Sequence, residues 1–305
     1  MNISSFTRAI PLMLGLLLAA LPAHAAALNV TVSIVPQRYV VEKIGGSLVD
    51  CSVMVQPGAS PATYEPKPGQ MTALANSSIY FAIGVPFENA WLPRIAAAAK
   101  SMRVVHMEES IKRVPMAAHH HHDHSEKHEH EHEGHHHGPL DPHVWTSPSL
   151  MRVLAGNTMK ALQQADPANA GTYKANLERF MAEIDALDKE LHAIFDPLRR
   201  PARFMVYHPA WGYFAADYDL IQVPVELEGK DPGPRELASL IRMAKKDNIR
   251  VVFVQPQFSR RSAEVIARAI NGRVQPANPL AENWAENLRT VSQSFRAAAA
   301  QTVNK

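Results

Sequence analysis

The sequence contains a single cysteine, Cys51, among its 305 residues. One cysteine cannot form an intramolecular disulfide, so the fold must be held together by its hydrophobic core. An excess of charge of one sign is also missing, because 31 lysines and arginines stand against 29 aspartates and glutamates. This balance gives no indication of binding to nucleic acid or to an anionic membrane surface.

Long hydrophobic runs are absent apart from the one between Ile10 and Leu21. That run follows Arg8 and precedes the small-residue pattern of residues 23–25, which together are typical of a secretory signal. It is too short to span a bilayer, where about 20 residues are needed. We therefore expect residues 1–25 to be a signal peptide that directs the chain to the periplasm. A lipid anchor is not expected, because Cys51 lies far from the cleavage point.

About 280 residues remain after the signal, more than one core usually holds, so we expect two lobes. Short hydrophobic runs alternate with helical segments, which predicts an α/β fold of two βα-wound lobes with central parallel sheets. In the first half we expect strands at residues 29–35, 51–55, 79–83 and 103–106, and helices at 37–44, 69–75 and 88–100. In the second half we expect strands at 203–207, 220–225, 251–254 and 273–275, and helices at 211–218, 234–246, 261–270 and 282–302.

The segment between the two lobes contains the longest predicted helix. Apolar residues keep helical spacing from 172 to 195 with no internal glycine or proline. At about 1.5 Å per residue this helix would be roughly 35 Å long, enough to join two lobes as a rigid connector, although it would also suit a core-packed helix. The expected boundaries are therefore 26–145 for the N-terminal lobe, 146–198 for the linker and 199–305 for the C-terminal lobe.

The 16 histidines are distributed unevenly, and 11 of them fall in one short tract. This tract mixes imidazoles with carboxylates and offers little to bury, so residues 118–138 are expected to form a mobile, disordered loop. Unprotonated imidazoles on such a loop should bind several metal ions weakly. A purification tag or an inert linker is the alternative, but the internal position and the interleaved acids argue against a tag. The histidines concerned are His119, His120, His121, His122, His124, His128, His130, His132, His135, His136 and His137.

Two of the remaining histidines, His143 and His208, stand where a strand or loop passes into a helix. Ligands of open parallel sheets bind at the carboxyl ends of strands, so both positions are natural binding sites. Each histidine alone could be a buried structural side chain, but one in each lobe favours a shared ligand, and imidazole suits zinc, copper or nickel. Asp141 could orient His143 by accepting its other ring proton. We expect His106 and His192 to be structural.

Five segments together resemble the zinc- and manganese-binding receptors of bacterial ABC importers, the TroA-like or zinc-uptake receptor family. They are PGASPATYEPKP at residues 57–68, the histidine tract, DPHVW at 141–145, YHPAWGYF at 207–214 and VQPQFS at 254–259. The resemblance implies two βα lobes joined by a long backbone helix, with one metal ion in the cleft between them. It also implies a monomer whose partner is an inner-membrane ABC permease with its ATPase.

The resemblance assigns His143 and His208 as metal ligands. A further histidine of the family pattern is replaced by Ala62, and a carboxylate is replaced by Asn278. Tetrahedral zinc needs three or four protein ligands, with water able to fill one position. Candidates to complete the coordination are a histidine of the tract, which we favour, and Glu65, Gln255 and Asn278.

These features predict a periplasmic solute-binding protein that captures a divalent transition metal, most simply Zn²⁺, with Mn²⁺ or another transition metal as the alternative. A periplasmic metal buffer or chaperone that binds through the histidine tract is a second hypothesis. A metallohydrolase is disfavoured, because the sequence has no His-Glu-x-x-His helix, no Gly-x-Ser-x-Gly elbow and no glycine-rich phosphate loop. We therefore expect no enzymatic activity, and no nucleic-acid partner.

Overall fold

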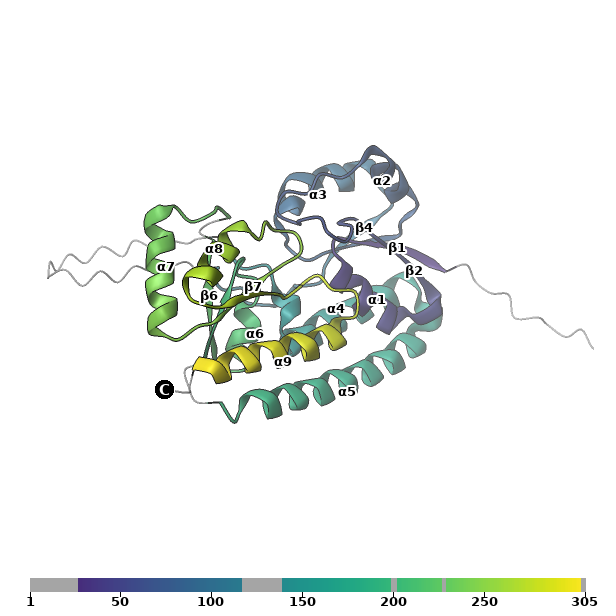
Figure 1. Ribbon diagram of the computed structural model, residues 1–305. Coiled ribbons are helices and arrows are strands. Elements are labelled where there is room, and N and C mark those ends of the chain that lie inside the picture. Colours follow the sequence, from purple (N-terminus) through teal and green to yellow (C-terminus); the bar gives the residue numbers. More distant parts are fainter. Residues whose placement is uncertain (1–26, 117–138, 199–201, 227–228, 303–305) are drawn as a thin grey trace, which may run out of the picture.

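A computed structural model of the chain describes residues 27–116, 139–198, 202–226 and 229–302. The expected signal peptide, residues 1–25, and the histidine tract, residues 118–138, lie outside these ranges. Within them, two lobes stand side by side above a layer of long helices (Figure 1).

The N-terminal lobe is a four-stranded parallel sheet in the order β2-β1-β3-β4. Its strands are apolar where they are central, and β3 is buried along its whole length. The strands are β1 Leu28–Val32, β2 Val49–Val53, β3 Ile79–Ala82 and β4 Arg103–His106, and the connecting helices are α1 Val35–Gly45, α2 Pro68–Ala73 and α3 Pro86–Ala98, with short 3-10 turns at Gly46–Leu48 and Leu74–Asn76.

The C-terminal lobe repeats this topology with a parallel sheet in the order β6-β5-β7-β8. Two sheets with the same strand order confirm the predicted pair of βα-wound lobes. The strands are β5 Ala202–Val206, β6 Leu220–Pro224, β7 Val251–Val254 and β8 Arg273–Pro276, and the helices are α6 Gly212–Asp217, α7 Pro234–Lys246, α8 Arg261–Ala269 and α9 Trp284–Thr302.

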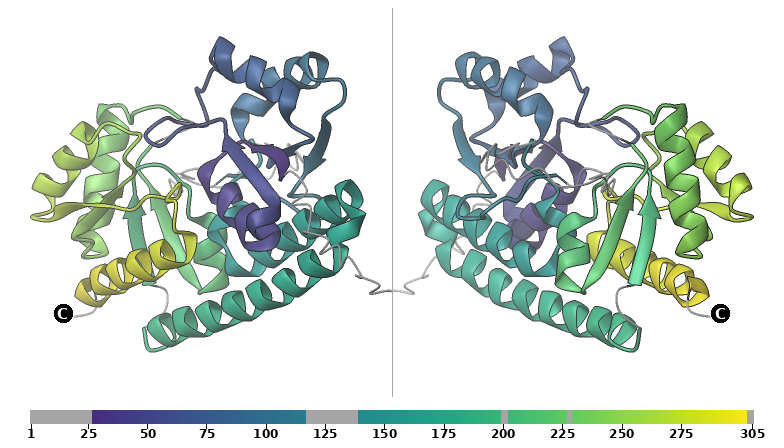
Figure 2. Two further views of the ribbon diagram at one scale, coloured as in Figure 1. Left: turned by 90° about the vertical axis from the view of Figure 1, so that its right-hand side faces the viewer. Right: turned by 90° about the vertical axis from the view of Figure 1, so that its left-hand side faces the viewer.

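Two long helices, α4 Pro148–Ala165 and α5 Ala170–Phe195, connect the lobes. The Ser147 hydroxyl caps α4 by accepting a hydrogen bond from the Leu150 backbone nitrogen at 3.1 Å. Helix α5 has 26 residues and is therefore about 39 Å long. It runs beneath both lobes, beside α9, and contacts α1, α4 and α9 (Figures 1 and 2). Short 3-10 turns, η3 Val144–Thr146 and η4 Pro167–Asn169, precede α4 and α5.

The first strand is shorter than the sequence predicts. Hydrophobic residues continue to Val35, yet β1 ends at Val32 and α1 begins at Val35. The side-chain oxygen of Gln37 accepts hydrogen bonds from the backbone nitrogens of Ser33 and Ile34, each at 3.0 Å. These bonds turn the chain before the hydrophobic run ends, so the last apolar residues enter the helix.

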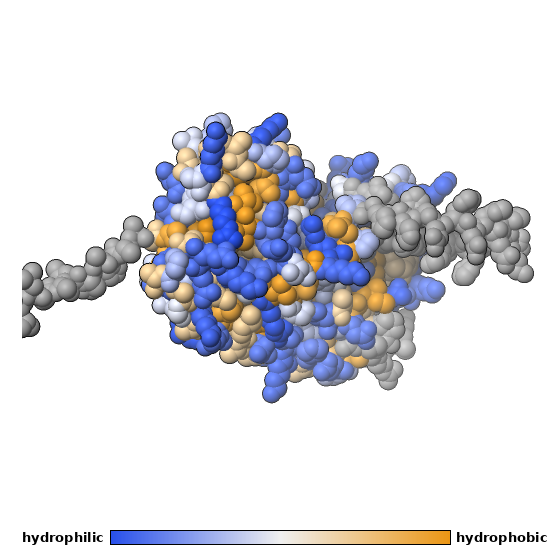
Figure 3. Space-filling model, turned by 180° about the vertical axis from the view of Figure 1, so that it is seen from behind, coloured by the Kyte–Doolittle hydropathy of each residue, from blue (hydrophilic) through white to orange (hydrophobic). Residues whose placement is uncertain are grey.

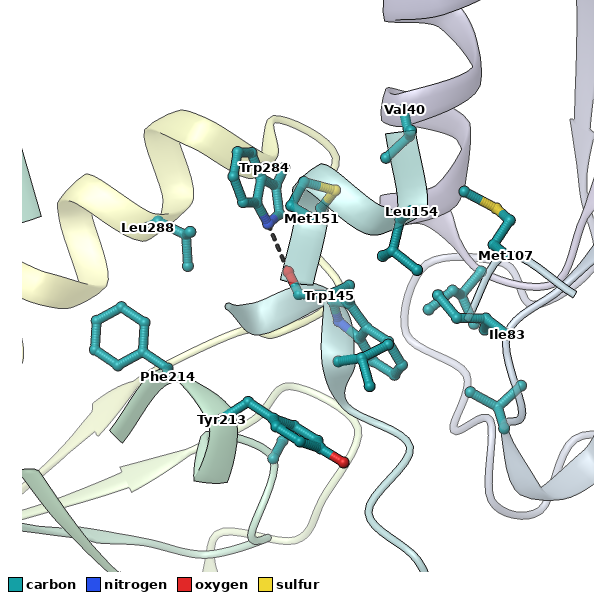
Figure 4. Close-up of a cluster of buried hydrophobic side chains, with 14 of the residues drawn as sticks. Val40, Ile83, Met107, Trp145, Met151, Leu154, Tyr213, Phe214, Trp284 and Leu288 are labelled. Atoms are coloured by element: carbon teal, nitrogen blue, oxygen red, sulfur yellow. Dashed lines mark hydrogen bonds between the residues drawn. The ribbon is translucent and has the colours of Figure 1, made fainter. Parts of the chain in front are cut away.

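The two lobes share a hydrophobic core, which chain length alone did not predict. One continuous cluster of buried side chains runs from Val30 in β1 to Phe295 in α9, and a second cluster lies inside the C-terminal lobe. Trp145 lies where the lobes meet, among side chains from α1, α4, α6 and α9 (Figure 4). Its indole nitrogen donates to the Pro279 carbonyl at 2.8 Å, and Trp284 donates to the Trp145 carbonyl at 2.7 Å. These contacts join the start of α4 to the start of α9.

Among the described residues, no helix is both long enough and apolar enough to cross a membrane. Seen from behind, the surface is a mixture of hydrophilic and hydrophobic residues on both lobes (Figure 3). Two large hydrophobic side chains, Val114 and Leu140, are each 48% exposed. Both stand close in sequence to the histidine tract, one on either side of it.

Candidate metal centre

A cavity of about 700 Å³ opens where the carboxyl ends of the two sheets face each other. Its walls come from the first residues after successive strands: Gly84 follows β3, His208 follows β5, Glu226 follows β6 and Gln255 follows β7. The strand order reverses between β1 and β3 in one sheet and between β5 and β7 in the other, and open parallel sheets bind ligands at the carboxyl ends of strands at such a switch point. His143, just before η3, completes the wall on the opposite side.

His143 is held in place by Asp141. The ring Nδ1 lies 2.7 Å from Asp141 Oδ1, and the same oxygen accepts a hydrogen bond from the His143 backbone nitrogen at 2.9 Å. Trp145 packs against the ring edge-on, with 5.2 Å between ring centroids. His143 is only 8% exposed, so its ring is fixed on three sides and presents Nε2 to the cavity.

Asp141 is itself fixed by the segment that follows β5. The Tyr213 hydroxyl donates a hydrogen bond to the Asp141 carbonyl at 3.0 Å. Gly212 stands so close that an added Cβ atom would lie 2.9 Å from Asp141 Oδ2. The motif around His208 therefore shapes the support of His143, because a larger residue at position 212 would displace the Asp141 carboxyl group.

His208 has a matching arrangement on the C-terminal lobe. Its Nδ1 lies 2.6 Å from Glu226 Oε1, and Glu226 is 4% exposed. Gln255 holds the backbone on both sides, because its amide nitrogen donates to the His208 carbonyl at 2.7 Å and its amide oxygen accepts from the His208 nitrogen at 3.3 Å. The ring of Phe258 stacks on the imidazole at 4.8 Å between centroids.

Glu226 was not among the residues singled out from the sequence. It stands two residues after the end of β6, as His208 stands two residues after the end of β5, so the rule that pointed to His208 applies to it equally. A carboxylate at a strand end, facing a histidine at the neighbouring strand end, is the signal that would have found it. From the sequence, a carboxylate partner is expected only for His143.

The two imidazoles face each other with their Nε2 atoms 3.2 Å apart. Two nitrogens bound to one tetrahedral zinc ion at 2.0 to 2.1 Å would be separated by about 3.3 Å. With each Nδ1–H donated to a carboxylate, each Nε2 keeps a lone pair. Two lone pairs this close repel unless both point at a shared cation beside them, so the geometry suits a shared metal ion.

The charge of the pocket also favours a cation. Asp141 and Glu226 are both buried, and among the described residues their ion-pair partners are His143 and His208. Burial lowers the pKa of His208, and the hydrogen bond to Glu226 opposes that effect without reversing it. His208 is therefore neutral at pH 7 and able to coordinate. The carboxyl groups of Asp141 and Glu226 lie directly behind the two rings, where they favour a cation bound at Nε2.

Other residues proposed from the sequence lie elsewhere or are engaged. Glu65 is exposed and does not line the cavity. The side-chain oxygen of Asn278 accepts hydrogen bonds from the Leu280 nitrogen at 3.0 Å and from Gln257 at 3.4 Å, outside the cavity lining. Both amide atoms of Gln255 are used by the His208 backbone, and Ala62 lines the cavity without a ligand atom.

No third protein ligand joins the two histidines within the described part of the chain. Across residues 27–116, 139–198, 202–226 and 229–302, no group of three His, Cys, Asp or Glu side chains is placed to hold a metal ion. The histidines proposed for metal capture, His119 to His137, lie outside those ranges. The described site therefore offers two nitrogens and leaves the other positions of a four-coordinate ion open.

Comparison with known proteins gives a consistent result. The family model described as zinc-uptake complex component A, periplasmic, matches residues 30–300. The high-affinity zinc uptake system protein ZnuA of Bacillus subtilis is 28% identical, covering 83% of this chain and 78% of that protein. The zinc-binding protein AdcA of Streptococcus pyogenes serotype M3 is 25% identical over 83% of this chain, which spans only 50% of AdcA.

Solved structures agree in fold and in sequence. A zinc-bound ZnuA with a deletion superposes with a TM-score of 0.81 at 40% identity, covering 90% of this chain and 98% of that one. A second ZnuA crystal structure gives a TM-score of 0.80 at 40% identity, with 90% and 99% covered. The two-lobed architecture with a long connecting helix is thus shared along nearly the whole length of these neighbours.

Proposed function

The chain belongs to the zinc-uptake complex component A family, and on that basis we propose that it is the receptor that captures zinc for an ABC importer. The ion is cargo, held between His143 and His208 until the receptor delivers it. The partner is an inner-membrane permease with its ATPase, and residues 1–25 direct the chain to the periplasm. The protein carries out capture and release, with no bond chemistry of its own.

One observation carries this proposal. The Nε2 atoms of His143 and His208 are 3.2 Å apart, with both Nδ1 atoms held by buried carboxylates. That separation is close to the distance of about 3.3 Å between two nitrogen ligands of one tetrahedral zinc ion. The rings come from different lobes, so an ion between them is bound by both.

The ligand type supports zinc over the other divalent ions. Imidazole nitrogen suits zinc, copper and nickel, whereas manganese, magnesium and calcium prefer oxygen ligands. Among the described residues the two nitrogens are the available ligands, and the carboxylates lie behind the rings. The histidines from His119 to His137 serve as additional weak sites that raise the local zinc concentration.

Alanine substitution of the ring pair tests the proposal. In a competition titration against a chromophoric zinc chelator, His143→Ala and His208→Ala should each remove the tightest zinc site. The loss should exceed the roughly 10- to 100-fold that removal of an orienting partner costs. The weaker sites of the histidine tract should remain in both variants.

His192→Ala is the matched control, because its ring lies on the exposed side of α5 between Asp188 and Asp196. It should bind zinc like the unaltered protein. Unchanged tight binding in both His143→Ala and His208→Ala would reject the site. A deletion strain that grows normally in zinc-depleted medium would instead favour the periplasmic buffer.

A further inference from the structure

The cavity is much larger than a metal ion needs. Its volume is about 700 Å³, whereas one water molecule takes about 30 Å³ of the liquid. The two imidazoles form one part of its wall, and most of the remaining wall is apolar. Apolar walls do not stabilise a hydrated ion, but they are typical of sites for organic ligands. Contributors to the apolar wall include Pro61, Val85, Pro86, Pro142, Phe258 and Leu280.

The coordination positions that the two rings leave open also point to an organic ligand. A four-coordinate zinc ion between His143 and His208 needs two more ligands, and the described residues supply neither. An α-amino acid offers an amino nitrogen and a carboxylate oxygen that bind one metal as a five-membered chelate ring. These two atoms, in place of the tract histidine that the sequence favours, would complete the four ligands, and the amino group would release a proton on binding.

One cationic side chain, Arg113, lines the same cavity. It lies against the turn after β3, where its guanidinium donates a hydrogen bond to the Gly84 carbonyl at 3.3 Å. The approach is close, because a Cβ atom at Gly84 would lie 2.2 Å from Arg113 Nη1. Within the described ranges Arg113 forms no ion pair, although Glu108 Oε1 lies beside the same glycine, 3.3 Å from an added Gly84 Cβ atom. Arg113 therefore offers a cationic hydrogen-bond donor to a ligand carboxylate in this cavity.

Given the zinc site proposed above, on which this inference rests, we propose that the cleft takes zinc as a ternary complex with a small α-amino acid. Its amino nitrogen and carboxylate complete the coordination of the ion held by His143 and His208. Arg113 binds the carboxylate, and the side chain of the amino acid packs against the apolar wall. The cargo is then a metal chelate, and the position of Ala62 is part of the space that it occupies.

Equilibrium dialysis of the mature chain with radiolabelled L-leucine, whose apolar side chain carries no further metal ligand, tests this proposal. One L-leucine per chain should be retained when zinc is present, and none when zinc is absent. Retention should be lost in the double variant His143→Ala/His208→Ala, which keeps the histidine tract. In Arg113→Met the amino acid should bind at least about tenfold more weakly, since a charge-assisted hydrogen bond is removed.

Lys112→Met is the matched control, because Lys112 is exposed and carries the same charge next to Arg113. It should retain L-leucine normally. Tight zinc binding that needs His143 and His208 but retains no amino acid would overturn the ternary complex and leave the zinc receptor intact. Retention that persists in the double variant would assign the amino acid to the tract and overturn it as well.

A parallel dialysis with radiolabelled citrate separates an apolar chelator from a polyanion. Retention of citrate with no retention of L-leucine would overturn the proposed role of the apolar wall. Retention of L-leucine in preference to citrate supports it. If the histidine pair binds no zinc at all, the function proposed above fails together with this inference.

Discussion

The carboxylate behind each imidazole decides which ring nitrogen is available to a metal ion. Asp141 lies 2.7 Å from Nδ1 of His143, and Glu226 lies 2.6 Å from Nδ1 of His208. An ionised carboxylate can only accept, so each Nδ1 carries the proton and each Nε2 is free to coordinate. Such partners also raise the basicity of the ligand and fix the orientation of its ring.

Substitution of Glu226 by glutamine tests this support directly. The amide keeps the shape of the side chain but removes its negative charge, so the His208 ring becomes a weaker ligand. Zinc affinity at the tight site should fall by roughly 10- to 100-fold in a chelator competition titration. Glu264→Gln makes the same charge change on α8, where the side chain is 45% exposed, and should leave the affinity unchanged. Equal losses in the two variants would mean that net charge, and not ring orientation, controls binding.

At this scale the sequence allowed the ring pair to be predicted, because histidines at strand ends are recognisable in one chain. Glu226 obeys the same rule and could have been included. The hydrogen bonds between the Gln255 amide and the His208 backbone could not be predicted, because they depend on where the fold places that backbone. For the same reason, the sequence could not show that Glu65 and Asn278 lie outside the cavity wall.

At the scale of the elements, the turn between β3 and α3 is held by a buried carboxyl group. Glu88 in the first turn of α3 is 3% exposed and accepts hydrogen bonds from the backbone nitrogens of Ile83 and Gly84. The Ser33 hydroxyl donates to the same carboxyl group. Burial raises the pKa of Glu88 to about 7, in spite of these hydrogen bonds. The turn also forms part of the cavity wall through Gly84.

This raised pKa predicts a pH dependence of stability for the metal-free protein. The folded state binds the proton of Glu88 more tightly than the unfolded state does. The resulting stabilisation is therefore fully present below about pH 4.5 and is lost as the pH rises through about 7. Chemical denaturation across this window should show a loss of up to about 3 kcal/mol from this group, which Glu88→Gln should abolish.

The control for this measurement is Glu109→Gln, an exposed carboxylate after β4. Its stability curve should run parallel to that of the unaltered protein. If Glu88→Gln also gives a parallel curve, Glu88 titrates near its ordinary pKa and burial does not control it.

The order and type of the elements could be predicted from hydrophobic spacing, because the central strands are nearly continuous apolar runs. The residues at which these elements begin and end could not be predicted as well. The hydrophobic run of β1 continues to Val35, but the chain turns at Ser33 because Gln37 accepts from two backbone nitrogens there. This contact, made by a side chain four residues later in the chain, leaves no periodic pattern in the sequence.

On the scale of the whole molecule, the shared core limits how the lobes can move. Trp145 is buried between them and is joined by hydrogen bonds to Pro279 and Trp284. Helix α5 packs against α1 of one lobe and against α9 beside the other. A large rotation of one lobe against the other would break this packing, so the cleft is expected to keep its width when zinc binds.

Small-angle X-ray scattering with and without zinc measures this directly. The radius of gyration should change by less than about 1 Å, the displacement typical of preorganised binding sites. His143→Ala provides the baseline for any effect of zinc on the histidine tract. A compaction seen with the unaltered protein and absent from His143→Ala would show that the lobes close on the ion.

Chain length and the alternation of strands and helices were sufficient to predict two lobes. They did not indicate that the lobes share one core. That core depends on α4, α5 and α9 meeting around Trp145 and Trp284, residues separated by more than a hundred positions in the chain. Contacts of such long range leave no periodic pattern in the sequence from which they could be read.

The tryptophan contact between the lobes also has a consequence for the history of the chain. A half-gene encoding either sheet alone would leave one side of Trp145 without its packing partners and would expose apolar side chains that now meet between the lobes. The two halves repeat one strand order, yet we expect that neither could be exchanged or inherited separately without a loss of stability. Substitutions on one side have to be matched on the other, so both halves are expected to evolve as one unit.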